Sequence, residues 1–384
     1  MNTMNSTFKS AMLAAAKLTA AGDLKAATAA IQRALAGKQA VAPTADAAGR
    51  AAAGPAQSFA PEGDIIDVEA RWRSDEALDG GTKNGRETAR ARDTADGRML
   101  AGTFGNAAGQ RDYLLYRPVP GASADGPRPL VIMLHGCTQS PADFAAGTAM
   151  NLLSDRHDFL VLYPGQSASA NPSACWNWFH PDSQRAQGGE PSIISGMVED
   201  IVNVHPVDRS RIFVAGLSAG GAMAAILADT CPDLIAAVAV HSGLRAGAAH
   251  DLPSALAAMK RGAPAPSVAR QRHPDERPRP VRTIVFHGRQ DRTVHPANGD
   301  QVADVALAGW PTGSLTVRQE KGRADGGRAY TRTRHVDPGG KVMVERWEVQ
   351  GAGHAWAGGS PLGTHTDPGG PDASAAMVDF FLAH

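Results

Sequence analysis

The chain has 384 residues, a length that suits one large α/β domain with additions better than a minimal domain. Hydrophobic residues make up 43% of it, which is enough for a large core, and its 38 basic side chains balance its 38 acidic ones. A formal net charge of zero gives no reason to expect nucleic acid or an acidic membrane surface as a partner.

Residues 1–36 show apolar positions at helical spacing, interrupted by a turn with Asp23 as a plausible N-cap. This pattern predicts a helical hairpin, which would pack on the main domain or on its own copy in a homodimer, and the alternative is an interaction module. The apolar run near Lys17 is too short for a clear signal peptide, and no run approaches a membrane span. We therefore expect no transmembrane segment and a cytoplasmic location, with secretion by a non-obvious signal as the alternative.

Residues 37–105 are rich in Ala, Gly, Asp, Arg and Thr and carry few large apolar side chains. Such a composition buries little surface, so we predict a flexible linker or loosely ordered arm. The pattern changes after this point, and we place the main domain at 106–384.

Apolar, strand-like runs alternate with helical patterns through the rest of the chain. The interior runs are continuously apolar, as strands buried on both faces should be. This alternation predicts an α/β fold with a mostly parallel sheet flanked by helices. The expected strands are 113–119, 129–136, 159–165, 211–218, 235–243, 281–288, 314–320, 328–336 and 342–350. The expected helices are 143–157, 192–204, 219–231, 298–308 and 372–384.

Ser218 stands in a G-x-S-x-G pattern at 216–220, directly after a strand and directly before a helix. In that context the small neighbours allow a sharp turn that exposes the serine as a nucleophile at a helix N-terminus. The alternative is a glycine-rich turn with no chemistry.

A nucleophilic serine needs a base, and the base needs an orienting acid. Asp291 and His354 each follow an expected strand, and they come after Ser218 in the chain order typical of α/β-hydrolases. His287 is a weaker candidate, and we expect His241 to pack beneath the site. We predict a Ser218–Asp291–His354 catalytic triad.

An oxyanion hole requires backbone N–H groups aimed at the developing negative charge. We assign one to Ala219, which follows the nucleophile, and the other to Cys137 in the loop after an early strand, with Thr138 as the alternative. The three cysteines contain no CxxC pair, so we expect no zinc or other metal site.

Five segments at these positions resemble the polyhydroxybutyrate depolymerase-type esterases, which are related to the feruloyl and acetylxylan esterases. They are HGCTQ at 135–139, CWNWF at 175–179, GLSAGGAMA at 216–224, HGRQDRTVHPANG at 287–299 and GAGHAWAGG at 351–359. The resemblance implies an α/β-hydrolase fold, a serine esterase mechanism through an acyl-enzyme, and no cofactor.

The resemblance also implies a substrate class, namely short-chain hydroxyalkanoate esters such as poly- or oligo-3-hydroxybutyrate. A feruloyl or acetylxylan esterase is the alternative, and a noncatalytic binding protein would require a broken triad. Secreted depolymerases commonly carry a signal peptide and a polymer-binding domain, and neither is evident here. We therefore expect soluble oligomers, amorphous polymer granules or small acyl esters as partners of the site.

The CWNWF segment lies in a long polar loop of the kind that builds pocket walls. We predict that Trp176 lines the pocket together with His135 and Thr138, while the other tryptophan belongs to the core. If this loop folds over the oxyanion strand, Cys175 comes near Cys137, which makes a disulfide between them a hypothesis.

Overall fold

The computed structural model describes residues 92–93, 98–118, 126–264 and 279–383. The predicted hairpin at 1–36 and the part of the predicted linker at 37–91 and 94–97 lie outside these residues.

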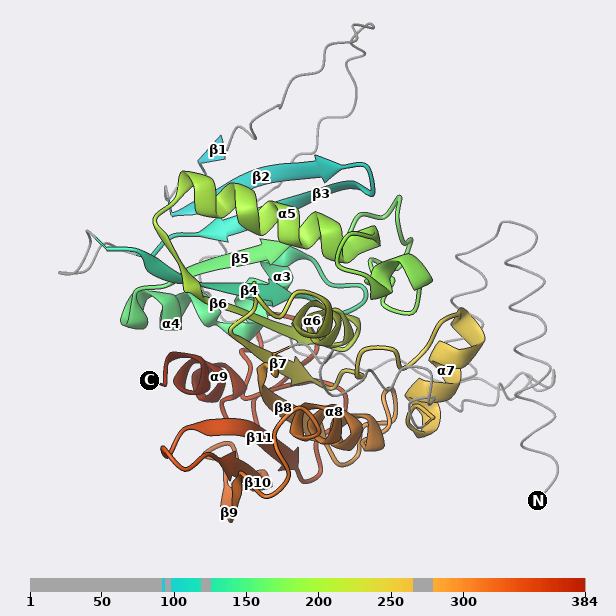
Figure 1. Cartoon of the computed structure of the whole chain (residues 1–384), viewed down its shortest axis with the longest axis vertical. Helices are drawn as coiled ribbons and strands as arrows, with labels where there is room; N and C mark the ends of the chain where they lie inside the picture. Colours follow the sequence, from blue (N-terminus) through green and yellow to red (C-terminus); the bar gives the residue numbers. More distant parts are fainter. Residues whose placement is uncertain (1–91, 94–97, 119–125, 265–278, 384) are drawn as a thin grey trace, which may run out of the picture.

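A single 11-stranded sheet runs through the described part of the chain (Figure 1), in the order β1-β2-β3-β5-β4-β6-β7-β8-β11-β10-β9. From β5 to β11 the neighbouring strands are parallel, and antiparallel strands complete both edges. The strands are β1 (Arg92–Asp93), β2 (Met99–Asn106), β3 (Gly109–Tyr116), β4 (Arg128–Leu134), β5 (Leu160–Pro164), β6 (Val207–Leu217), β7 (Ala237–His241), β8 (Arg282–Gly288), β9 (Thr316–Arg323), β10 (Ala329–Val336) and β11 (Val342–Val349). A separate two-stranded sheet pairs β12 (Trp356–Ala357) with β13 (Thr366–Asp367).

Helices cover both faces of the large sheet (Figure 1), which confirms the predicted α/β-hydrolase architecture. One face carries α5 (Gly189–Val204), α6 (Ala219–Thr230), α7 (Leu252–Arg261) and α8 (Ala297–Leu307). The other carries α3 (Pro141–Thr148), α4 (Met150–His157) and α9 (Ala373–Leu382). A short 3-10 helix, η1 (Pro181–Gln184), precedes α5. The expected helix at 143–157 is broken at Ala149, whose φ is 52°.

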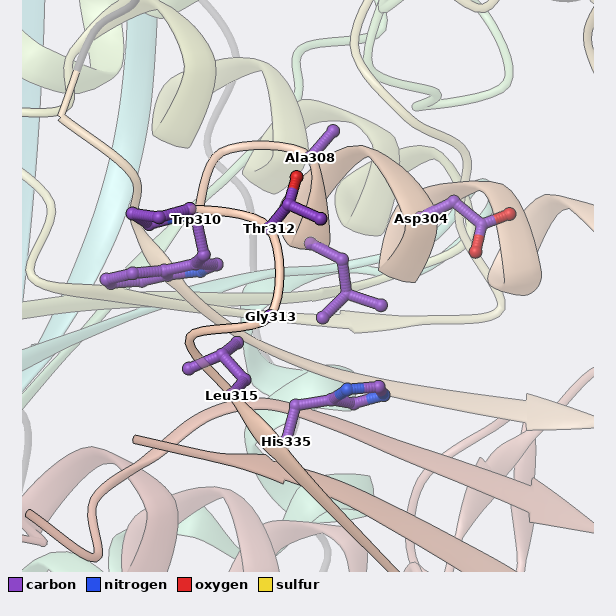
Figure 2. A pocket seen from close by; sticks show the side chains of 9 residues that line it. Asp304, Ala308, Trp310, Thr312, Gly313, Leu315 and His335 are labelled. Carbon is purple, nitrogen blue, oxygen red and sulfur yellow. The ribbon is translucent and has the colours of Figure 1, made fainter. Parts of the chain in front are cut away.

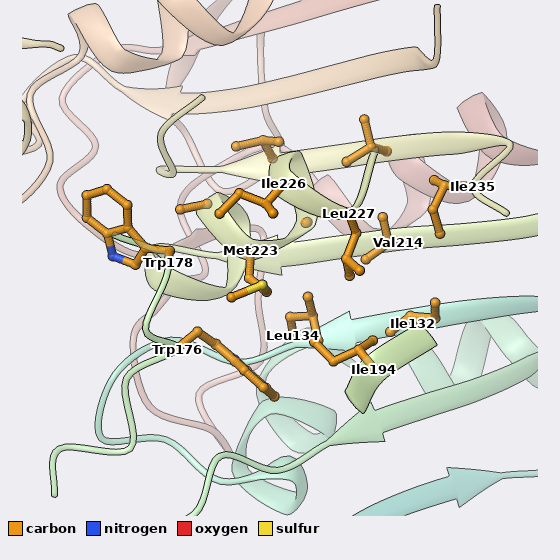
Figure 3. Close-up of a cluster of buried hydrophobic side chains, with 14 of the residues drawn as sticks. Ile132, Leu134, Trp176, Trp178, Ile194, Val214, Met223, Ile226, Leu227 and Ile235 are labelled. Atoms are coloured by element: carbon orange, nitrogen blue, oxygen red, sulfur yellow. The ribbon is translucent and has the colours of Figure 1, made fainter. Parts of the chain in front are cut away.

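The core consists of two layers that the central strands separate. In β4, Ile132 and Leu134 belong to the layer beneath α5 and α6, while Val131 and Met133 belong to the layer beneath α3 and α9. Figure 3 shows the first layer, in which Leu134 lies near Met223 of α6. Burial on both faces explains why these strands read as continuous apolar runs.

The start of the sheet corrects the predicted domain boundary. Residues 99–105, which we assigned to the linker, form most of β2, and β2 pairs with β3 along its whole length. The apolar positions of β2 are few because only Leu100 and Gly102 of the strand are buried. Among the residues that the structure describes, no helix is long and apolar enough to span a membrane.

Candidate active site

Ser218 occupies a sharp corner between β6 and α6. Its backbone has φ 57° and ψ −118°, a conformation that non-glycine residues adopt only when the surroundings impose it. The neighbouring Gly220 is required sterically, because a Cβ atom there would lie 2.1 Å from the carbonyl oxygen of Leu134. The half-buried serine therefore stands at the tip of a tight strand-to-helix turn, as the sequence pattern predicts.

Asp291 and His354 meet at the same edge of the sheet, because Asp291 follows β8 and His354 follows the adjacent parallel strand β11. His354 Nδ1 lies 2.7 Å from Asp291 Oδ2. The other carboxylate oxygen, Oδ1, accepts the backbone N–H groups of Thr293 and Val294, each at 2.9 Å. The carboxylate is thereby held with one oxygen reserved for the imidazole.

The surroundings keep Asp291 ionised. Burial works to raise the pKa of this carboxyl group, but the contacts from His287 and His354 outweigh burial and hold the pKa well below its ordinary value. His287 Nε2 lies 3.5 Å from Asp291 Oδ2 and 2.9 Å from the carbonyl oxygen of Val294, so His287 also fixes the loop that carries the acid. An ionised acid on Nδ1 orients the imidazole and stabilises its protonated form.

The loop after β4 lies against the Ser218 corner. A Cβ atom on Gly136 would lie 3.6 Å from the Cβ of Ser218. Thr138 donates its N–H to the carbonyl oxygen of Ser173 at 2.7 Å, whereas in the described part of the chain the N–H groups of Cys137 and Ala219 have no acceptor. Two free donors next to the serine suit an oxyanion hole, and they favour Cys137 over the alternative Thr138.

A disulfide joins Cys137 to Cys175, with Cα atoms 4.2 Å apart, so the hypothesised pairing is present in the structure. Cys231 is the free cysteine of the chain. The disulfide ties the oxyanion loop to the CWNWF segment, which confirms that this segment folds over the end of β4.

The predicted pocket role of Trp176 is wrong. Its side chain is 0% exposed and packs in the core layer shown in Figure 3, and its indole N–H donates to the carbonyl oxygen of His135 at 3.1 Å. Trp178, at 5% exposed, is also part of this layer. The segment turns its tryptophans inward because they close the core beneath α5 and α6.

His135 is likewise no substrate contact. It is 1% exposed, its Nδ1 lies 2.8 Å from the carbonyl oxygen of Gly136, and its Nε2 accepts the N–H of Gln166 at 3.1 Å. Burial, more than any other influence, lowers the pKa of His135. The neutral ring therefore links the loop at Gly136 to the loop at Gln166. Thr138 is exposed at the site, and its substrate contact stays a prediction.

Two features of the site were not predicted from the sequence. Buried Glu190, at the start of α5, accepts hydrogen bonds from Arg111, Gln166 and Asn177, and this network anchors the loop that carries Cys175. No short motif marks it, since its members are scattered along the chain. The second feature is exposed His365.

His365 Nε2 lies 3.5 Å from Thr138 Oγ1. The backbone of His365 has a positive φ of 53°. Burial of part of the ring, together with the nearby His354, lowers its pKa. A histidine shortly after the GAGHAWAGG segment was the available signal for this second imidazole near the site.

Figure 2 shows a separate hollow at the C-terminal end of α8, and none of its lining residues belongs to the site described above. It is bordered by Asp304, Leu307, Ala308, Trp310, Pro311, Thr312, Gly313, Leu315 and His335. Within the described residues, no group of three or more His, Cys, Asp or Glu side chains could hold a metal ion.

Comparison with known proteins gives one family and several relatives. The profile of the family described as Esterase PHB depolymerase matches residues 111–316, more than half of the chain. The poly(3-hydroxyalkanoate) depolymerase C of Paucimonas lemoignei is 32% identical over 246 residues, which cover 63% of this chain and 56% of that protein. Feruloyl esterase B of Thermothelomyces thermophilus is 31% identical over 193 residues, covering 47% of this chain and 64% of that protein.

The match thus spans less than two thirds of either relative's length. Among solved structures, an acetyl xylan esterase from Aspergillus awamori superposes with a TM-score of 0.50 at 20% identity, over 71% of this chain and 93% of that one. This likeness supports the fold.

Proposed function

The chain belongs to the Esterase PHB depolymerase family, and on this premise we propose that it is a serine hydrolase of carboxylic esters. One observation carries the proposal above all others. A strained serine corner lies beside unpaired backbone N–H groups, at the sheet edge where a buried aspartate holds a histidine by Nδ1. That combination is the working part of an acyl-transfer site.

In the first half of the reaction, His354 takes the proton of Ser218 Oγ as this oxygen bonds to the ester carbonyl carbon. The carbonyl oxygen becomes an anion, which the N–H groups of Ala219 and Cys137 stabilise. The bond to the alcohol oxygen then breaks, and protonated His354 gives its proton to the leaving alcohol. An acyl ester on Ser218 remains.

In the second half, His354 takes a proton from water, and the resulting hydroxide oxygen bonds to the acyl carbon. The same N–H groups hold the second oxyanion, the bond to Ser218 Oγ breaks, and His354 returns the proton to that oxygen. Asp291 keeps the imidazole in one tautomer and stabilises its charged form throughout. The carboxylic acid then leaves.

The Ser218→Ala variant tests this mechanism. We expect it to lose hydrolysis of p-nitrophenyl butyrate by a factor of about 10³ or more, because no other oxygen replaces the nucleophile. Its thermal unfolding midpoint should stay near that of the unchanged protein. Ser169→Ala, which changes an exposed serine, is the matched control and should keep full activity. Turnover by the Ser218 variant equal to that of the control would refute the mechanism.

For the substrate, we propose short-chain hydroxyalkanoate esters, either oligomers or amorphous polymer. Support comes from the family and from the name of the Paucimonas lemoignei relative. A feruloyl or acetylxylan ester is the alternative, supported by relatives of nearly equal identity. The burial of Trp176 removes the aromatic pocket residue that we had expected, and this weighs against a ring-binding cleft.

A substrate panel separates these alternatives. It contains hydroxybutyrate oligomers, amorphous polymer, a feruloyl ester and acetylated xylan, with Ser218→Ala as the blank. We expect the highest kcat/KM for the hydroxybutyrate oligomers. If kcat/KM for a feruloyl ester or for acetylated xylan is tenfold higher than for the hydroxybutyrate oligomers, the substrate belongs to the alternative class.

Granule binding and dimerisation through residues 1–36 remain proposals, and these residues lie outside the described structure. A deletion that tests them must end at residue 91 and not at 105, because β1 and β2 belong to the sheet. We expect the shortened protein to keep its activity on a soluble ester and to lose binding to amorphous granules. Equal granule binding with and without the segment would remove this role.

The disulfide bears on location. Disulfides persist in oxidising compartments and are rare in the cytosol, so Cys137–Cys175 favours the secreted alternative over the cytoplasmic location that we first expected. We propose an oxidising compartment for the mature enzyme. Thiol titration of the denatured, unreduced protein from its natural source should find one free thiol, that of Cys231, and three would contradict the proposal.

A further inference from the structure

His241, the last residue of β7, is hydrogen-bonded both to Ser218 and to the segment that follows His354. Its backbone carbonyl oxygen accepts the N–H of Ser218 at 2.9 Å. Its ring Nε2 accepts the N–H of Ala357 at 2.9 Å, and Ala357 belongs to the short strand β12 that follows His354 closely. We propose that His241 is a positioning residue that sets Ser218 against His354, an inference that rests on the function proposed above.

The hydrogen bonds fix the protonation of the His241 ring. Because a backbone N–H can only donate, the Nε2 atom that faces Ala357 must be unprotonated. The neutral ring then carries its proton on Nδ1, which lies 3.2 Å from Ser242 Oγ and can donate to it. One face of the ring stacks on Phe286 at 5.7 Å between centroids, and Trp356 stacks at 5.0 Å. The ring has one tautomer and little freedom to turn.

The charge state is fixed as well. The ring is 1% exposed, and burial is the chief reason that the pKa of His241 falls to about 3. His287 and His354 lower the pKa further, while Asp291 works in the opposite direction. The ring is therefore neutral at pH 7, and the acceptor on Nε2 is available there.

The backbone around His241 needs this support. Ser218 has φ 57° and Ser242 has φ 49°, so strained residues lie on both sides of the carbonyl that holds the nucleophile corner. On the other side, Ala357 is 2% exposed, and its N–H would be buried without a partner if Nε2 were removed. A loop that shifts to satisfy that N–H would carry His354 with it. A misplacement of about 1 Å between reacting groups typically costs roughly 10²-fold in rate.

Two neutral amides provide the test. In His241→Gln, the side-chain oxygen can reach the position of Nε2 and accept the Ala357 N–H. In His241→Asn, the amide reaches only the position of Nδ1, so the N–H loses its acceptor. With p-nitrophenyl butyrate we expect the Gln variant to keep kcat within about threefold and the Asn variant to lose about 10- to 100-fold, while KM stays near the unchanged value in both. Equal kcat in the two variants would overturn the inference, because a merely structural role does not distinguish them.

Ser218→Ala, measured in the same assay, separates failure of the proposed function from failure of the positioning role of His241. If it remains active, the proposed function itself fails. If it is inactive while the two His241 variants behave alike, only the positioning role fails.

A measurement on the unchanged protein keeps the inference falsifiable if the Asn variant does not fold. Long-range ¹⁵N–¹H correlation spectra of histidine-labelled protein report which ring nitrogen carries the proton. We expect a neutral His241 ring at pH 7 with the proton on Nδ1, assigned by its absence from the spectrum of the Gln variant. A proton on Nε2, alone or with one on Nδ1, would overturn the inference.

Discussion

Replacing Asp291 by asparagine should reverse the hydrogen bond that orients the proposed catalytic base. In the structure, Oδ1 accepts two backbone N–H groups and Oδ2 faces His354 Nδ1 at 2.7 Å. An asparagine keeps its single oxygen on the two N–H donors, which places its NH₂ group against the imidazole. His354 must then accept at Nδ1 and carry its proton on Nε2, and in that tautomer the ring cannot take the proton of Ser218.

The size of the effect follows from this geometry. Because the wrong tautomer removes the base while leaving the N–H donors at Ala219 and Cys137 in place, we expect kcat to fall by about 10³- to 10⁴-fold. That loss corresponds to roughly 4–5.5 kcal/mol of transition-state stabilisation. KM should change little, since no proposed substrate contact is altered. The free energy of unfolding should fall by about 1.5–3 kcal/mol, because a hydrogen bond between neutral groups replaces one to a charged, buried acceptor.

The assay is hydrolysis of p-nitrophenyl butyrate from pH 6 to pH 9, with unfolding followed by circular dichroism. Asp300→Asn is the matched control, because Asp300 pairs with Arg346 at the surface and should contribute no more than about 1 kcal/mol to stability. A kcat for the Asp291 variant within tenfold of the control would refute the assigned role. An equal loss of kcat in both variants would show that the change in net charge, rather than this hydrogen bond, is responsible.

Three further outcomes follow from the packing and the charges. Gly220→Ala should lower the free energy of unfolding by about 1–3 kcal/mol, because the new Cβ atom would clash with the carbonyl oxygen of Leu134. Chemical denaturation checks this. The control is Gly126→Ala, where the new Cβ atom meets nothing within 4 Å. Glu190→Gln should lower the free energy of unfolding by about 3–5 kcal/mol, since it leaves the buried guanidinium of Arg111 without its charged partner. An unchanged midpoint of chemical denaturation would contradict this. The pKa of His241 lies at about 3 in the folded protein and at about 6.5 in the unfolded chain, so its contribution to stability is complete above pH 6.5 and is lost as the pH falls toward 3. Unfolding midpoints from pH 7.5 to pH 4 should therefore fall more steeply than in His241→Gln, and parallel curves would contradict this.

The candidate catalytic residues could be found from the sequence because each depends on a local pattern. Ser218 and Asp291 each follow a strand that reads as an apolar run, and His354 follows the mixed strand VMVERWEV. Parallel strands bring their ends to one edge of the sheet, so these three residues were expected to lie at the same edge. The order of the strands in the sheet was not needed for this prediction. The resemblance then narrowed the chemistry to ester hydrolysis.

The direction of the loop side chains could not be predicted, because it depends on contacts between distant segments. Trp176 turns inward since β4, α5 and α6 leave a space that its indole fills, and nothing local records that space. For the same reason residues 99–105 were predicted to be linker, since β3 supplies the strand pairing of β2 and only Leu100 and Gly102 of β2 are buried. His365 escaped notice because its position next to Thr138 comes from chain segments far apart in sequence.

The two ends of the sheet have a consequence for behaviour in concentrated solution. An open strand edge offers unpaired N–H and C=O groups on which another chain can add a strand and begin aggregation. At one end β1 is only 2 residues long, and at the other the exposed strand β9 carries Arg318, Glu320, Lys321 and Arg323. A short edge gives little to pair with, and a charged edge must give up hydration and meet its own charges when two copies approach. The two edge strands that the structure describes thus give a second copy of the chain a poor template for strand addition.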